Sequence, residues 1–345
     1  MPSNGYNLRS LFCRLQIWLL PLSWTFVLSA ITPVGVAQSS IDDVHIRTPR
    51  TELAEENKAG NSSSPPSSRP LKVDVDLVLV PVTVTDEMER LVLGLEKENF
   101  QVYENNHLQS VQHFSTTDAP VSVGIILDTS GSMASKIDRA REAVIEFLKT
   151  ANPQDEFFMV SFADTPTNLV NFTTSPDEIT NNLIFARPRG MTALVDAIYL
   201  GVAKLRSASN TKKALLIISD GGDNHSRYTE KDLKGLVKES DVIIYAIGVY
   251  DRSFPTLEEQ LGPELLTDIA SATGGRSFTI DNPNDLPDVA SKIGVELRNQ
   301  YVLGYRPSEA RGDGKWHKIK VKLLPPRGLP RLQVSVKQGY YAREQ

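Results

Sequence analysis

The sequence predicts an α/β fold with a doubly wound, mostly parallel sheet between residues 120 and 298. Compact runs of β-branched and aromatic residues occur at 121–127, 157–162, 214–218 and 242–249, as is typical of parallel strands buried on both faces. Segments with apolar residues at helical spacing separate these runs. Strands that alternate with helices in this way indicate a parallel sheet covered by helices on both faces.

The first helix is expected over 137–148, where Ile137, Ala140, Val144 and Phe147 recur three or four residues apart. The same spacing predicts a helix over 194–205, directly before the third strand run. Two further helices are expected over 265–270 and 289–297, which place the end of the α/β domain near residue 298.

Strand patterns flank the α/β domain on both sides. Apolar residues alternate from Leu71 to Val84, with a kink or bulge expected near Pro81, and residues 71–117 read as one β-strand region. A second β-strand region occupies residues 299–345. We expect the two regions to join in one small β-sandwich into which the α/β domain is inserted. The alternative is two separate β appendages that flank the domain.

The N-terminal segment has the layout of an export signal. Residues 1–37 hold Arg9 and Arg14, no acidic residue, an apolar stretch over 15–31 and the small-residue end Gly35-Val36-Ala37. This layout predicts a signal peptide, with an uncleaved membrane anchor as the alternative. Residues 38–70, rich in serine, proline and charge, are expected to be a disordered linker. We therefore expect an exported protein, periplasmic or extracellular, that contacts a membrane only through an uncleaved N-terminus.

Composition argues against nucleic acid as a general partner and against disulfide bonds. The formal net charge is -5, and the single cysteine, Cys13, lies in the expected leader. A general nucleic-acid-binding surface is not expected at this charge, and no disulfide is expected in the exported part.

Oxygen-bearing side chains gather where predicted strands end and predicted helices begin. Asp128, Ser130 and Ser132 follow the first strand, Thr192 precedes a helix, and Asp220 follows another strand. Ligands bind open parallel sheets beyond the carboxyl ends of the strands, so these five side chains are expected on one rim. Two carboxylates and three hydroxyls suit Mg²⁺, with Mn²⁺ or Ca²⁺ as alternatives. The lack of histidine and cysteine among them argues against Zn²⁺.

This pattern, Asp-x-Ser-x-Ser followed by Thr and then Ser-Asp-Gly, resembles the metal-ion-dependent adhesion site of von Willebrand factor A domains. The resemblance implies a Rossmann-like fold and a non-enzymatic adhesion or assembly module. It also implies that Ser130, Ser132 and Thr192 ligate the ion directly, and that an acidic side chain of a partner protein fills an open position. Residues 70–345 are similar to a bacterial, Acidobacteria-type group of such proteins through ENFQVYE (98–104), SDGGDNHS (219–226), YVLGY (301–305) and GYYA (339–342).

Plainer interpretations remain open at this stage. The serines and Thr192 are residue types that commonly cap helices, and the loop after Asp220 has ordinary turn chemistry. Asp196 and Asp223 are interpreted equally well as residues that support the metal ligands or as purely structural residues. His225, on the loop after Asp220, is interpreted as a surface residue, with a position near the metal as the alternative. The alternative functions are a metal-dependent hydrolase of the cell envelope and a metal-free structural envelope protein.

Overall fold

The computed structural model describes residues 77–342 except 221, 251–256, 309–312, 325 and 327, and of residues 257–261 it describes the backbone alone. The expected signal peptide (1–37), the expected linker (38–70) and the first residues of the expected β-strand region lie outside the described residues. No helix in the described part of the chain is both long and apolar enough to cross a membrane.

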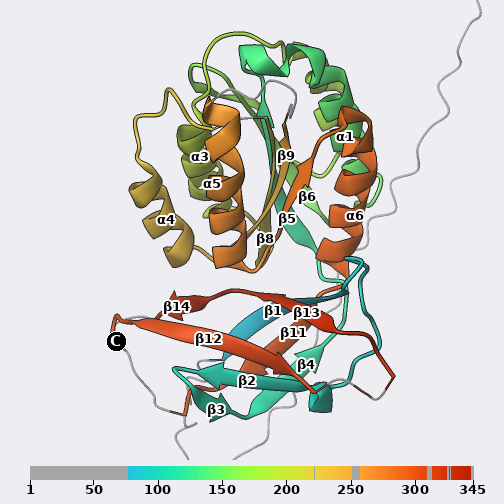
Figure 1. Ribbon diagram of the computed structural model, residues 1–345, viewed down its shortest axis with the longest axis vertical. Helices are drawn as coiled ribbons and strands as arrows, with labels where there is room; N and C mark the ends of the chain where they lie inside the picture. The colour runs from blue at the N-terminus through green and yellow to red at the C-terminus, as the bar shows by residue number, and fades with distance from the viewer. Residues whose placement is uncertain are drawn as a thin grey trace, which may run out of the picture. The chain divides into compact units, whose positions relative to one another are not determined.

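A six-stranded sheet forms the centre of the α/β domain (Figure 1). Neighbouring strands pair in parallel, except that the edge strand β7 runs antiparallel to β6. The buried strand β5 lies between β8 and β6, so its carboxyl end is near the middle of the sheet. In spatial order the strands are β10 (Ser277–Ile280), β9 (Val242–Val249), β8 (Lys212–Ser219), β5 (Val121–Asp128), β6 (Glu156–Phe162) and β7 (Pro166–Thr173).

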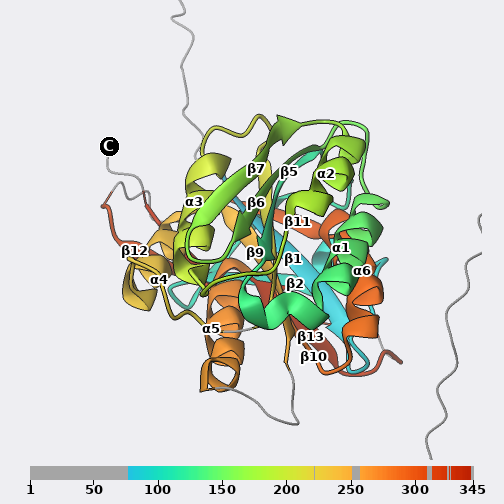
Figure 2. The same cartoon turned by 90° about the horizontal axis from the view of Figure 1, so that it is seen from above.

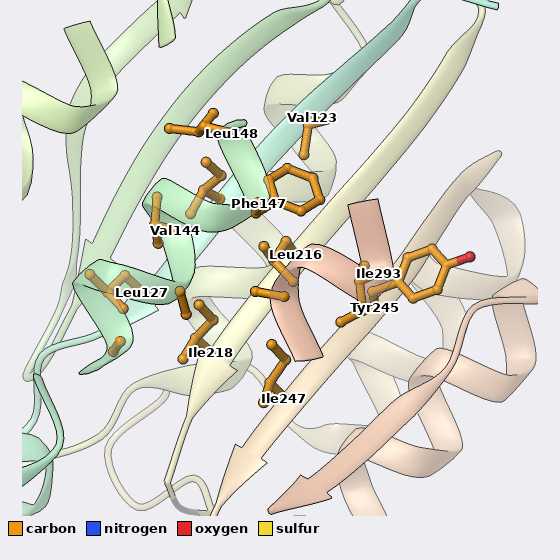
Figure 3. Packing of buried hydrophobic residues seen from close by; sticks show 14 of the residues in the cluster. Val123, Leu127, Val144, Phe147, Leu148, Leu216, Ile218, Tyr245, Ile247 and Ile293 are labelled. Atoms are coloured by element: carbon orange, nitrogen blue, oxygen red, sulfur yellow. The ribbon is translucent and has the colours of Figure 1, made fainter. Parts of the chain in front are cut away.

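Helices cover both faces of this sheet (Figure 2). One face packs against α1 (Ile137–Leu148) and α6 (Leu286–Arg298), with Val144, Phe147 and Ile293 among the buried contacts (Figure 3). The other face packs against α3 (Leu194–Leu205), α4 (Glu230–Glu239) and α5 (Leu257–Thr273). A further short helix, α2 (Pro176–Asn182), follows β7. The predicted doubly wound, mostly parallel fold is confirmed.

Two antiparallel four-stranded sheets are built from strands on both sides of the α/β domain. Their orders are β13-β1-β11-β4 and β14-β12-β2-β3, so each sheet mixes N-terminal and C-terminal strands. Side chains from both sheets form one shared apolar cluster, which includes Val82, Val102, Leu303 and Val321. The predicted β-sandwich with an inserted α/β domain is therefore confirmed. The strands are β1 (Val78–Asp86), β2 (Phe100–Glu104), β3 (His107–Gln109), β4 (Val111–Ser115), β11 (Tyr301–Tyr305), β12 (Trp316–Leu323), β13 (Leu332–Val336) and β14 (Gly339–Tyr341).

A buried polar network lies inside the sandwich. The Glu104 carboxylate accepts a hydrogen bond of 2.6 Å from the Tyr305 hydroxyl and lies 2.7 Å from Nδ1 of His317. Nε2 of His317 lies 3.1 Å from the Asp313 carboxylate. Burial lowers the pKa of His317, but the hydrogen bonds and charges of the two carboxylates outweigh burial and leave that pKa raised. The network therefore favours the protonated form of the imidazole.

Several elements differ from the sequence-based expectation. The edge strand β7, the short strand β10 and the helix α4 were not expected, and α5 and α6 are longer than predicted. Of the kink or bulge predicted near Pro81, the bulge is wrong, because β1 keeps a continuous register with β11 from Val78 to Val82. The nearest irregularity lies instead between Gly304 and Tyr305, where β11 pairs with β4.

Candidate metal centre

The centre begins where β5 ends. The backbone N–H and the hydroxyl of Thr129 both donate to the carbonyl of Phe162, each at 2.8 Å, and this pair of bonds fixes the turn. The chain then enters a short 3₁₀ helix over Gly131–Ser135 and continues into α1. The turn therefore carries Asp128, Ser130 and Ser132 out of the sheet within five residues, at the carboxyl end of a central strand.

Hydrogen bonds link this turn to the end of the neighbouring strand β8. The Ser130 and Ser132 hydroxyl oxygens lie 3.0 Å apart, and Ser132 donates to Oδ1 of Asp220 at 2.8 Å. Asp128 accepts from the backbone N–H of Ser130 at 2.8 Å and from the Ser219 hydroxyl at 2.5 Å. The structure thus brings four of the five predicted residues together, joined directly or through Ser219.

The fifth predicted residue, Thr192, lies on a loop that is held against the turn. The Gly131 N–H donates to the Gly190 carbonyl at 3.1 Å, and the Arg189 N–H donates to the Thr129 carbonyl at 2.8 Å. Thr192 itself is 6% exposed. Its hydroxyl takes part in none of the hydrogen bonds found within the described residues, which leaves this oxygen available to an ion.

A second loop, after Asp220, supports Thr192 and the start of α3. The Asn224 side chain accepts from the Thr192 N–H at 2.8 Å, and Asp223 accepts from the Val195 N–H at 3.0 Å. Asp196 accepts from two N–H groups of the same loop, those of residues 227 and 228, at 2.9 and 3.1 Å. Asp196 and Asp223 therefore have structural roles in anchoring this loop.

His225 is exposed, as interpreted from the sequence, and donates its backbone N–H to the Thr192 carbonyl at 3.1 Å. It therefore touches the loop of Thr192 through its backbone.

One charged residue of the centre had not been identified from the sequence. Lys136, just before α1, is almost buried, and its Nζ lies 2.8 Å from Oδ2 of Asp220 and 3.3 Å from the Val249 carbonyl. Nothing in the local sequence distinguishes it from a solvent-exposed lysine, because its partner is 84 residues away. Ser219 belongs to the Ser-Asp-Gly motif, but its bond to Asp128 does not follow from the motif.

Burial controls the electrostatics of the two carboxylates. Asp128 and Asp220 are both 0% exposed. Burial first, and then the charge of Asp220, raise the pKa of Asp128 to about 6, although hydrogen bonds from Ser219 and Ser130 oppose this rise. A cation between the two carboxylates would relieve both causes of the shift. The two carboxylates and three hydroxyls form an oxygen-only donor set, which fits a hard divalent ion such as Mg²⁺.

Comparisons with known proteins identify the domain. The family model described as "von Willebrand factor type A domain" matches residues 122–292. Residues 122–292 belong to the von Willebrand factor type A family. This VWA domain thus contains all five predicted ligands. Domains of the family are typically non-enzymatic modules that bind other proteins.

Individual relatives of the VWA domain are distant. Inter alpha-trypsin inhibitor heavy chain 4 of Mus musculus is 25% identical over 224 residues, which cover 58% of this chain and 23% of that protein. The chain thus spans about a quarter of the length of this relative.

Among solved structures, a von Willebrand factor type A protein from Catenulispora acidiphila gives a TM-score of 0.46 at 14% identity, covering 78% of this chain and 73% of that chain. The conserved hypothetical protein BatB from Bacteroides thetaiotaomicron gives a TM-score of 0.42 at 18% identity, and the match covers 51% of this chain and 98% of that chain.

Proposed function

We propose that the VWA domain is a metal-dependent protein-binding module. Asp128, Ser130, Ser132, Thr192 and Asp220 would hold one Mg²⁺, with Mn²⁺ or Ca²⁺ as substitutes. When bound, the ion would supply a Lewis-acidic position for an acidic side chain of a partner protein. The activity would be adhesion or assembly, without chemical change in the partner.

The observation that carries this proposal is the hydrogen-bonded chain from Ser130 through Ser132 to Asp220, on the turn against which the loop of Thr192 is held. A serine that only caps a helix would accept from a backbone N–H group, but Ser130, the N-cap residue of the 3₁₀ helix, makes no side-chain capping bond. The hydroxyls bond to each other and to a buried carboxylate instead. That arrangement favours the metal-binding interpretation.

The surrounding residues would orient the ligands. Ser219 and the Ser130 N–H hold the Asp128 carboxylate from two sides, and Lys136 holds one oxygen of Asp220. Because both carboxylates are fixed, little side-chain entropy would be lost when an ion binds. The Lys136 ammonium would also favour a partner of negative charge at the loaded site.

A binding role is proposed rather than hydrolysis, because VWA domains are typically non-enzymatic interaction modules. We also propose that the protein is exported to the periplasm or the extracellular space. This proposal rests on the leader-like composition of residues 1–37.

Partner capture with and without a chelator tests the proposed function. The chain would be immobilised and exposed to an envelope extract in Mg²⁺, and bound proteins would be released with EDTA. We expect a defined protein to elute with EDTA from the parent and to be missing from Asp128→Ala. Asp288→Asn, which removes one exposed charge on α6, is the matched control and should behave as the parent. Equal capture by Asp128→Ala in Mg²⁺ would contradict the proposal.

A further inference from the structure

The outer face of one sandwich sheet carries an uninterrupted row of lysines. Along β12 the buried residues His317, Ile319 and Val321 alternate with exposed ones. The exposed side chains therefore point away from the sandwich core, on one face of the sheet. They belong to Lys318, Lys320 and Lys322.

Aromatic and apolar side chains flank this row. Trp316 pairs with Tyr341 across β12 and β14, with ring centroids 5.1 Å apart, and Lys320 pairs with Tyr103 across β12 and β2. Tyr103 in turn pairs with Leu108 on β3. Leu108 is 61% exposed and Tyr341 is 44% exposed. We call this surface the lysine face; it consists of Tyr103, Leu108, Trp316, Lys318, Lys320, Lys322 and Tyr341.

The charge of the lysine face is not balanced locally. None of its three lysines forms an ion pair within the part of the chain that the structure describes; Lys322 lies 4.7 Å from the ring centroid of Tyr103 instead. Glu104, the acidic residue of β2, points inward to Tyr305 and His317. A row of unpaired cations is unexpected on a chain with 42 acidic and 37 basic residues. Its charge complements an anionic surface.

The helix α4 brings further lysines to the edge of the sheet, although it carries as many acidic residues as lysines and Lys234 pairs with Asp268 at 2.8 Å. Lys238 lies 5.9 Å from the Trp316 ring centroid. A groove of about 590 Å³ separates α4 from Tyr341 and is lined by Lys231, Lys234 and Lys238, with Glu230 as its acidic member. Figure 1 shows α4 beside β14, at the edge of this sheet. The groove thus adds lysines next to the aromatic pair.

We propose that the lysine face is a docking surface for an anionic phospholipid membrane. Lysines along one face contribute about 1 kcal/mol each to binding of anionic lipid, which is about a fivefold change in affinity per residue. Tryptophan and tyrosine favour the membrane–water interface, where an apolar ring and a polar atom are both accommodated. The sheet places the lysines and the aromatic rings on the same side, so that they can meet one surface together.

Vesicle binding tests the proposal. The chain without residues 1–37, the expected signal peptide, keeps Trp316 as its only indole, because the other two tryptophans, Trp18 and Trp24, lie in that segment. In buffer with EDTA, we expect binding to vesicles of phosphatidylglycerol and phosphatidylcholine, weakening as salt is raised, and no binding to phosphatidylcholine alone. The Trp316 emission should shift to the blue when the indole enters the interface.

Matched lysine substitutions make the test specific. Lys318→Gln, Lys320→Gln and Lys322→Gln together should weaken vesicle binding on the order of 100-fold. The control removes the same charge from the α/β domain with Lys149→Gln, Lys204→Gln and Lys292→Gln, and it should bind as the parent does. Circular dichroism checks that both triple variants are folded.

The proposal would be overturned if the two triple variants bound equally, or if phosphatidylcholine alone were bound as well as the anionic mixture. Tighter binding to a soluble polyanion, such as a polyuronate or single-stranded DNA, than to the vesicles would also overturn it. Asp128→Ala should bind vesicles normally, since the lysine face contains none of the proposed metal ligands. Failure of the metal site would therefore leave this proposal intact.

Discussion

Asp128→Asn is expected to stabilise the metal-free protein, although it removes a proposed metal ligand. Asp128 is fully buried, and burial together with the charge of Asp220 raises its pKa from 3.8 to about 6. The folded state without an ion therefore binds a proton at this carboxylate more tightly than the unfolded state does. Asparagine keeps an acceptor for the Ser130 N–H, and its amide can donate to the Ser219 hydroxyl oxygen.

The pKa shift of Asp128 sets the expected change in the free energy of unfolding. A rise from 3.8 to about 6 corresponds to about 3 kcal/mol at roughly 1.4 kcal/mol per unit of pKa. Because the folded pKa is the higher one, this stability is present at low pH and is lost as pH rises from about 4 through about 6. At pH 7 the ionised Asp128 thus lowers the free energy of unfolding by about 3 kcal/mol relative to asparagine.

Urea unfolding in EDTA measures this difference. We expect Asp128→Asn to be more stable than the parent by about 2–3 kcal/mol at pH 7 and by much less near pH 4. Added Mg²⁺ should stabilise the parent and leave the variant nearly unchanged. Asp288→Asn, the exposed control, should show neither effect. The reasoning would be refuted if Asp128→Asn were less stable than the parent in EDTA at pH 7, or if the difference did not depend on pH.

Three further substitutions test other parts of the structure. Lys136→Met leaves the buried Asp220 without its ammonium partner, so the free energy of unfolding in EDTA should fall by about 3–5 kcal/mol, and Mg²⁺ should restore part of it. Thermal and urea unfolding measure this, and an equal loss with and without Mg²⁺ would contradict the prediction. Gly190→Ala should weaken Mg²⁺ affinity, because φ of Gly190 is 75° and a Cβ there would lie 2.5 Å from the Asp164 carboxylate. Calorimetry measures the affinity, and an unchanged value would contradict the prediction. His317→Gln should lower the free energy of unfolding more at pH 6 than at pH 9. Because the pKa of His317 is raised in the folded state, the stability that it contributes is largest below about pH 6.5 and is lost as pH rises through the folded pKa. A loss that did not depend on pH would exclude a charged imidazole.

The sequence was sufficient for the elements with strong apolar patterns. The strand predicted over 242–249 is β9, and the strand predicted over 121–127 is β5 with Asp128 added, because both are buried on both faces and contain almost only apolar residues. The edge strand β7, with the sequence PTNLVNFT, exposes much of its length and shows no such run. The helix α4 buries only Leu233, Leu236 and Val237 among charged residues, so its apolar pattern is short.

The candidate site likewise contains residues that the sequence predicts and one that it does not. Asp128, Ser130, Ser132 and Asp220 could be placed from the sequence because they lie at, or within four residues of, the end of a strand that the apolar pattern fixes. Lys136 could not be placed, since its orientation depends on contacts across the fold to Asp220 and to the carbonyl of Val249 at the end of β9. Local sequence carries no information about which way a lysine turns at the start of a helix.

Calorimetric titration of Mg²⁺ into the chelator-treated chain tests the central claim most directly. Five oxygen-bearing side chains around one ion predict a single binding event with one Mg²⁺ per chain. The event should be lost in Asp220→Asn and Ser132→Ala and retained in Asp288→Asn. No heat of Mg²⁺ binding in the folded parent, or the same binding in Asp220→Asn, would contradict a metal centre at this edge of the sheet.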